Sequence, residues 1–150
     1  MNKPLNAILI TALVFSACSK KPVVELPITT TSPKALEHYS KAMLYQEVNE
    51  GFESKTDLDL ALALDSNFAM AIENYPTQDP LVRRKNREKV DSLIDKLSMS
   101  EQLRIKINRS YRDENMDRAL KHAKKLVELH GDSYDSYLWL GQVQSDRNEI

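Results

Sequence analysis

Signals that start and stop α-helices alternate along the sequence from Ser32 onward, and they constrain the fold more than any other feature. Ser32-Pro33 combines an N-cap side chain with a proline at the first helical position. Ser98 and Glu101 have the spacing of a capping box. No convincing signal for a β-hairpin occurs between such sites. The sequence therefore predicts an all-α protein.

Apolar residues recur at helical spacing between these signals. Gly51 is expected to end the first helix, and Pro76 to end a short third one. The expected helices cover about 34–49, 54–64, 68–74, 80–97, 98–112, 116–130 and 134–145. In the fifth of these, Leu103, Ile105 and Ile107 also alternate, which leaves a β-strand open at that place.

The composition excludes several functional classes. The chain has three glycines in 150 residues, and their positions cannot supply the glycine-rich loops that bind nucleotide phosphates. A net charge of −1 argues against a dedicated nucleic-acid-binding protein. The single cysteine excludes an intrachain disulfide and a Cys-rich zinc site.

The sequence predicts neither a metal site nor a catalytic one. His122 and His130 stand about two helical turns apart, but no third ligand follows at metal-binding spacing. The acidic residues are scattered, so no catalytic pair is indicated by spacing. We expect no cofactor and no enzymatic activity.

One charge cluster and one aromatic side chain leave alternatives open. The run from Arg83 to Lys89 could contact phosphate or anionic lipid. Glu88 interleaves with its cations, however, and this pattern favours a solvated helix face. Trp139 could contact a ligand or face a neighbouring helix.

Residues 1–17 have the organisation of a signal peptide. Lys3 supplies the positive start, residues 7–15 form an apolar run, and Ser16 and Ala17 supply the small residues that end such a segment. An apolar run of this length is too short to span a bilayer as a helix, which needs about 20 residues.

The segment Phe15-Ser16-Ala17-Cys18 resembles the lipobox of bacterial lipoproteins, although Phe15 stands where that family prefers Leu. The resemblance implies lipidation of Cys18, and Ser19 implies sorting to the outer membrane. Residues 18–33 contain three prolines and a Thr/Ser run without helical period, so we expect the lipidated cysteine and a flexible tether there. The expected location is the bacterial cell envelope, with the membrane contacted through the lipid.

Two stretches of the helical region match each other. Residues 61–71 and 126–136 both join the end of one helix to the start of the next, and they lie 65 residues apart. This separation is close to twice a period of 34 residues, and such self-similarity is typical of repeat architectures.

Both stretches resemble the junction between tetratricopeptide repeats. Tyr137, Leu140 and Gly141 occupy the aromatic, leucine and small-residue positions of that family's first helix, and Ala119 and Ala123 match its second helix. The resemblance implies a right-handed solenoid of helical hairpins over residues 34–150, with the last hairpin incomplete. It implies that the first helices line a groove for a protein or peptide partner. The groove positions expected from it are Tyr39, Met43, Gln46, Asp135, Leu138 and Gln142.

The favoured hypothesis is a membrane-anchored interaction scaffold. Two alternatives stay open: a nutrient lipoprotein that binds glycans, and the repeat region of a larger sensor or enzyme.

Overall fold

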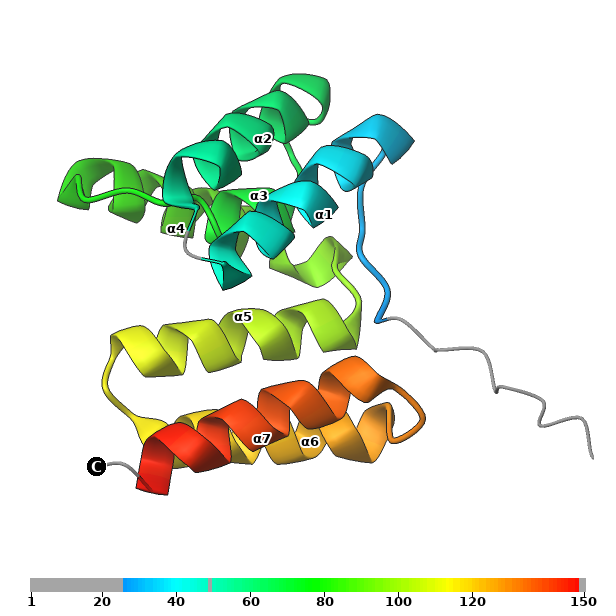
Figure 1. Ribbon diagram of the computed structural model, residues 1–150, viewed down its shortest axis with the longest axis vertical. Coiled ribbons are helices and arrows are strands. Elements are labelled where there is room, and N and C mark those ends of the chain that lie inside the picture. The colour runs from blue at the N-terminus through cyan, green and yellow to red at the C-terminus, as the bar shows by residue number, and fades with distance from the viewer. Residues whose placement is uncertain (1–25, 49, 149–150) are drawn as a thin grey trace, which may run out of the picture.

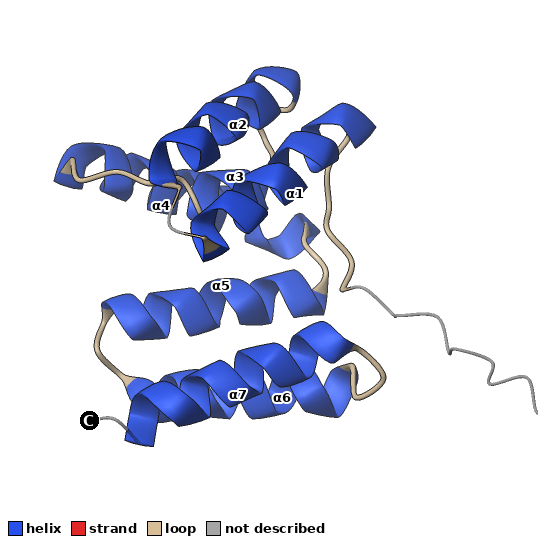
Figure 2. Cartoon of the chain, in the orientation of Figure 1, coloured by secondary structure: helices blue, strands red, loops and turns tan. Residues whose placement is uncertain are grey.

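The computed structural model describes residues 26–48 and 50–148, and every regular element in them is helical (Figures 1 and 2). The helices are α1 (Pro33–Glu47), α2 (Gly51–Leu64), α3 (Ala69–Glu73), α4 (Pro80–Leu93), the 3₁₀-helix η1 (Ile94–Lys96), α5 (Met99–Arg112), α6 (Met116–Leu129) and α7 (Tyr134–Asn148). The all-α prediction is confirmed.

The helices pack in pairs of neighbours along the chain. α1 lies against α2, the short α3 against α4, and α5 against α6, while α7 packs against α6 (Figure 1). We call α1, α3, α5 and α7 the first helices, because each follows a junction or the N-terminal segment, and α1, α3 and α5 each precede their partner in sequence. The architecture is an array of helical pairs.

The predicted caps begin the helices. Ser32 Oγ accepts the Ala35 amide at the start of α1, and Asp79 Oδ1 accepts the amide of Leu81 at the start of α4. Ser98 and Glu101 form the complete capping box of α5. These side chains satisfy amides that have no partner inside their helix.

Two helix boundaries differ from the prediction. Gly51 begins α2 and does not end α1, which stops at Glu47 with Val48 as its C-cap. A helix-ending glycine usually adopts a left-handed conformation, and none of the glycines in the described residues has a positive φ. α4 stops at Leu93, and its last expected turn tightens into η1.

Helix α5 lies between two buried clusters, and this explains the alternating pattern in its sequence. Ile105 packs into the cluster formed with α1 to α4. Leu103 and Ile107 pack into the second cluster, with α6 and α7. The open alternative of a strand is therefore wrong, because a helix that is covered on two sides needs apolar residues on both.

Residues 26–32, which we call the N-terminal strap, contact the helical pairs. Leu26 is 5% exposed and belongs to the second cluster, whereas Ile28 packs against the first. The strap is extended, as expected for the tether, but it is packed onto the domain rather than free. Its course from α1 to the start of α5 is visible in Figure 1.

Two buried carboxylates hold the strap. Glu101 accepts the Thr29 amide at 2.6 Å and the Thr29 hydroxyl at 2.7 Å. Asp65 accepts the Thr30 hydroxyl at 2.7 Å and the Thr31 amide at 2.9 Å. Both acceptors lie at helix ends, so the strap connects the end of α2 with the start of α5.

None of the helices in the described residues is both long enough and apolar enough to cross a membrane. The signal peptide expected at 1–17, the lipidated Cys18 and residues 19–25 of the expected tether lie outside the described residues.

Candidate functional site

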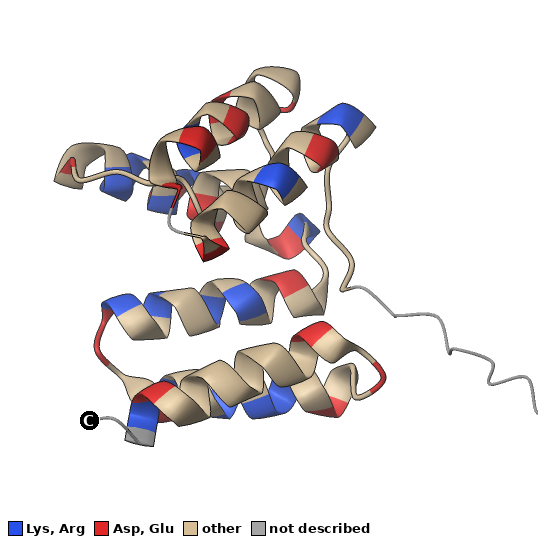
Figure 3. Cartoon of the chain, in the orientation of Figure 1, with Lys and Arg blue, Asp and Glu red and all other residues tan. Residues whose placement is uncertain are grey.

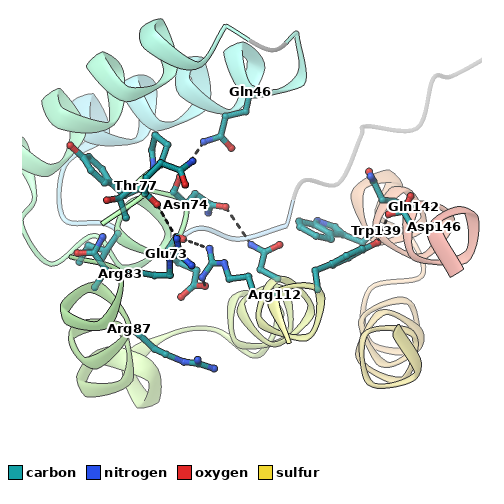
Figure 4. A pocket seen from close by; sticks show the side chains of 17 residues that line it. Gln46, Glu73, Asn74, Thr77, Arg83, Arg87, Arg112, Trp139, Gln142 and Asp146 are labelled. Atoms are coloured by element: carbon teal, nitrogen blue, oxygen red, sulfur yellow. Dashed lines mark hydrogen bonds and ion pairs between the residues drawn. The ribbon is translucent and has the colours of Figure 1, made fainter. Parts of the chain in front are cut away.

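A cavity with a volume of about 730 Å³ opens among the C-terminal parts of the first helices. All four contribute to it: Gln46 from α1, Glu73 from α3, Asn108 from α5 and Gln142 from α7. The segment 74–78 and one side of α4 complete the wall (Figure 4). We call this cavity the groove.

Amide side chains connect the first helices at a regular sequence spacing. Asn74 Nδ2 donates to Tyr39 Oη at 3.3 Å, across 35 residues. Asn108 Nδ2 donates to Asn74 Oδ1 at 3.3 Å, across 34 residues. Gln142 lies 34 positions beyond Asn108 and lines the same groove. Side-chain hydrogen bonds thus connect α1 to the end of α3, and the end of α3 to α5.

A buried ion-pair network fixes the floor of the groove. The side chain of Glu73 is 1% exposed, and its carboxylate contacts Arg112 Nη1 at 2.7 Å and Arg109 Nη2 at 3.3 Å. Arg112 Nη2 also donates to the Glu73 carbonyl at 2.8 Å, and Arg109 Nη1 contacts Asp91 at 2.6 Å. The network joins α3, α4 and α5. A carboxylate buried without partners would be strongly unfavourable, so Glu73 needs both arginines of α5 to remain buried.

A contact between α5 and α7 borders the groove on the side of α7. Tyr111 Oη donates to Asp146 Oδ2 at 2.8 Å. Burial and this hydrogen bond raise the pKa of Tyr111 well above its ordinary value. The Tyr111 phenol therefore stays protonated at neutral pH and continues to donate its hydrogen bond to the Asp146 carboxylate.

Two arginines of α4 and one tryptophan of α7 give the groove chemically different sides. Arg83 and Arg87 are exposed and line the side formed by α4. Trp139 lines the side formed by α7, where the guanidinium of Arg104 lies 5.9 Å from its ring centre. Figure 4 shows the arginines and the tryptophan on opposite sides.

The expected groove residues are distributed unevenly. Gln46 and Gln142 line the groove at its two ends. Asp135 is half-buried and Leu138 is exposed on α7, and neither side chain lines the groove.

Two further expected groove residues belong to the core. The ring of Tyr39 is buried, lies 5.0 Å from the ring of Phe68, and reaches the groove only through the bond between its hydroxyl and Asn74. Met43 is half-buried and packs against the first cluster. Tyr39 therefore supports the groove from below, because an aromatic ring at this position is needed to fill the space between α1 and α3.

The groove residues that sequence reasoning missed are Asn74, Asn108 and the two arginines of α4. A search for polar residues at intervals of 34 or 35 could have found the asparagines, although the first helices themselves begin 36, 30 and 35 residues apart. The arginines carried no such signal, because a cation-rich helix usually faces solvent. Figure 3 shows that basic residues recur on α4, α5 and α6, so charge alone does not single out α4.

The groove is lined by groups that can contact a ligand. Amides and guanidinium groups supply hydrogen bonds, and Trp139 supplies an apolar surface. In residues 26–48 and 50–148, no group of three or more His, Cys, Asp or Glu side chains is placed to hold a metal ion.

No family model, no curated protein and no solved structure matches this chain.

Proposed function

We propose that the chain is a membrane-anchored scaffold lipoprotein that holds an extended segment of a protein partner in the groove. The observation that carries this proposal is that all four first helices line one cavity. A surface built in this way is continuous across successive helical pairs, as in repeat proteins that bind extended ligands.

The side chains in the groove suit a peptide backbone. Gln46, Asn108 and Gln142 each carry an amide that can donate and accept hydrogen bonds, whereas the Asn74 amide group already donates to Tyr39 Oη and to the Met70 carbonyl. An extended peptide presents the same two groups at every residue. The volume of the groove lies in the range of ligand sites, about 300–1,000 Å³, so it suits a short segment and not a whole domain.

The spacing of the groove contacts supports a tetratricopeptide-like, right-handed solenoid. The side-chain contacts span 34 and 35 residues, close to the 34-residue period that the resemblance implies. The middle pair departs from the pattern, because α3 has only one and a half turns and α4 follows a proline-bounded loop.

The anchoring part of the proposal rests on Cys18 and the segment before it. Cys18 lies eight residues before Leu26, where the packed strap begins, so an extended chain reaches at most about 29 Å between them. The helical domain would therefore stay close to the membrane surface.

The proposal is tested by filling the groove from both ends. The double variant Gln46→Trp/Gln142→Trp changes two exposed groove residues, and Ser40→Trp/Gln144→Trp changes two exposed residues of the same helices outside the groove. The full chain is purified from crosslinked cell envelopes, and co-purifying proteins are identified by mass spectrometry. A partner retained by the wild type and the control but lost from the groove variant supports the proposal. A partner retained by all three, or by none, contradicts it.

Trp139 favours a second candidate, binding of a glycan. Aromatic faces and amide side chains are the groups that contact sugar rings and hydroxyls, and both occur in the groove. Binding of the purified full chain to an array of neutral glycans, lost on Trp139→Ala, would favour this function over the scaffold.

A further inference from the structure

We infer that the partner segment is acidic and extended, with two carboxylate side chains separated by one residue, and that Arg83 and Arg87 of α4 bind these two carboxylates. The inference rests on the proposed scaffold function and names the chemical class of the partner.

The spacing of the two arginines carries the inference. Arg83 and Arg87 lie four positions apart on α4, on the side that lines the groove together with Asn86. Four residues of α-helix rise about 6 Å. In an extended peptide, side chains two residues apart point to the same side and are about 6.6 Å apart. The sequence Glu-x-Glu or Asp-x-Asp therefore matches the spacing of the two arginine positions along α4.

The guanidinium groups of this pair are available to a ligand. Arg83 Nη2 donates only to the Thr77 carbonyl at 3.4 Å, and within the described residues no acidic side chain pairs with Arg83 or Arg87. The acidic residues of the groove are engaged elsewhere: Glu73 by Arg109 and Arg112, and Asp146 by Tyr111. The side of the groove formed by α4 is thus cationic.

Other basic residues of α4 do not contribute to the groove. Arg84 forms an ion pair with Glu88 at 3.7 Å, and neither Arg84 nor Lys85 lines the cavity. They provide a matched control, because they carry the same charge on the same helix but on another side of it.

The position of the arginines favours a peptide over a membrane surface or a nucleic acid. Arg83 and Arg87 share a concave site with Asn108 and Gln142, whose amides suit a peptide backbone. A lipid surface would contact a protruding face, and a nucleic acid would need a broad basic surface, which a net charge of −1 does not provide. A carboxylate bound by arginine also gains paired hydrogen bonds of fixed geometry.

The test is a selection from a random linear peptide library with the purified full chain in detergent, repeated with two variants. Arg83→Gln/Arg87→Gln removes both groove cations, and Arg84→Gln/Lys85→Gln removes two cations outside the groove. Peptides selected by the wild type are then titrated against all three proteins by fluorescence anisotropy. Vesicles of phosphatidylglycerol and a single-stranded oligonucleotide are titrated in parallel.

We expect the wild type and the control to enrich peptides with two acidic residues separated by one. The selected peptides should bind the variant Arg83→Gln/Arg87→Gln about tenfold or more weakly than the wild type, which corresponds to about 1.4 kcal/mol. Two results would overturn the inference but leave the scaffold function standing. One is enrichment of peptides without this acidic spacing, and the other is enrichment of acidic peptides that bind the groove variant as tightly as the wild type. Vesicles or oligonucleotide that bind through Arg83 and Arg87, without any selected peptide, would overturn both, as would the absence of any enrichment.

Discussion

Thr29 is bound to Glu101 by two hydrogen bonds, from its amide at 2.6 Å and from its hydroxyl at 2.7 Å, although 72 residues separate them in sequence. Glu101 is fully buried and also accepts the amide of Ser98 at 2.9 Å. One carboxylate therefore starts α5 and holds the N-terminal strap. A segment that the sequence presents as a tether is in this way part of the folded domain.

A double-mutant cycle with Thr29→Val and Glu101→Gln measures this connection. Thr29→Val removes the hydroxyl donor of an exposed residue, so we expect it to lower the free energy of unfolding by about 0.5–1.5 kcal/mol, whereas Glu101→Gln changes a fully buried acceptor and should cost about 1–3 kcal/mol. The two effects should be non-additive, with a coupling energy of about 0.5–3 kcal/mol. Urea unfolding followed by circular dichroism provides the values.

The exposed pair Glu37 and Lys41 on α1 serves as a control cycle, because pairs of this kind contribute only about 0.3–0.5 kcal/mol. Additive effects of Thr29→Val and Glu101→Gln would show that the strap is free in solution.

Stability should depend on pH through Asp65. Burial by itself raises the pKa of Asp65, but hydrogen bonds from Thr31, Thr30 and Asn67 outweigh burial and hold the pKa below its ordinary value. The charged form is favoured in the folded state, so its contribution is present above the unfolded pKa of about 3.9 and is lost as the pH falls through the lower folded pKa.

Asp65→Asn should therefore be less stable than the wild type at pH 7, and the difference should shrink below about pH 4. Urea unfolding of both proteins at several pH values measures the difference, with exposed Asp132→Asn as the control. A difference that is independent of pH would contradict this role of the Asp65 charge.

Replacing Gly141 by alanine should stabilise the domain. Gly141 lies inside α7, and a Cβ added there meets no atom within 4 Å. Glycine costs about 0.8–1.0 kcal/mol relative to alanine inside a helix, so Gly141→Ala should raise the free energy of unfolding by up to about that amount. At Gly131, an added Cβ would lie 3.2 Å from the carbonyl oxygen of Val127, so Gly131→Ala should give no such gain. Destabilisation by Gly141→Ala would show that another helix packs against this position.

The anchor is tested by Cys18→Ala. We expect the wild type to incorporate a fatty-acid analogue in cells and to fractionate with membranes, because several acyl chains together give stable attachment. Cys18→Ala should lose both properties, whereas Ser19→Ala should keep the acylation. Membrane fractionation of Cys18→Ala without any acylation would contradict the proposed lipid anchor.

The number and kind of helices could be predicted from the sequence because their signals are local. Ser32, Asp79 and Ser98 cap the helices that they were expected to begin. Gly51 misled the prediction, since a glycine before a helix and one after a helix look alike in sequence, and only the backbone conformation distinguishes them.

The strap and most of the groove could not be predicted, because they depend on residues that are distant in sequence. Pro27 and the three threonines of residues 26–32 indicate an extended segment, but not that Leu26 is buried against α5 to α7. Similarly, Arg83 and Arg87 resemble any solvated helix face until α4 is placed beside α5. Gln46 and Gln142 were found because the resemblance to tetratricopeptide repeats assigns groove positions to the helices that carry them.

The central claim, that one partner segment occupies the whole groove, is tested most directly by photo-crosslinking from its two ends. A photoreactive amino acid is placed in living cells at Gln46 or at Gln142, with Gln144 as the control on the same helix, and crosslinked peptides are identified by mass spectrometry. We predict that Gln46 and Gln142 crosslink to the same segment of the same protein, at positions a few residues apart, and that Gln144 does not. Crosslinks from the two ends to unrelated proteins, or equal crosslinking from Gln144, would contradict the account.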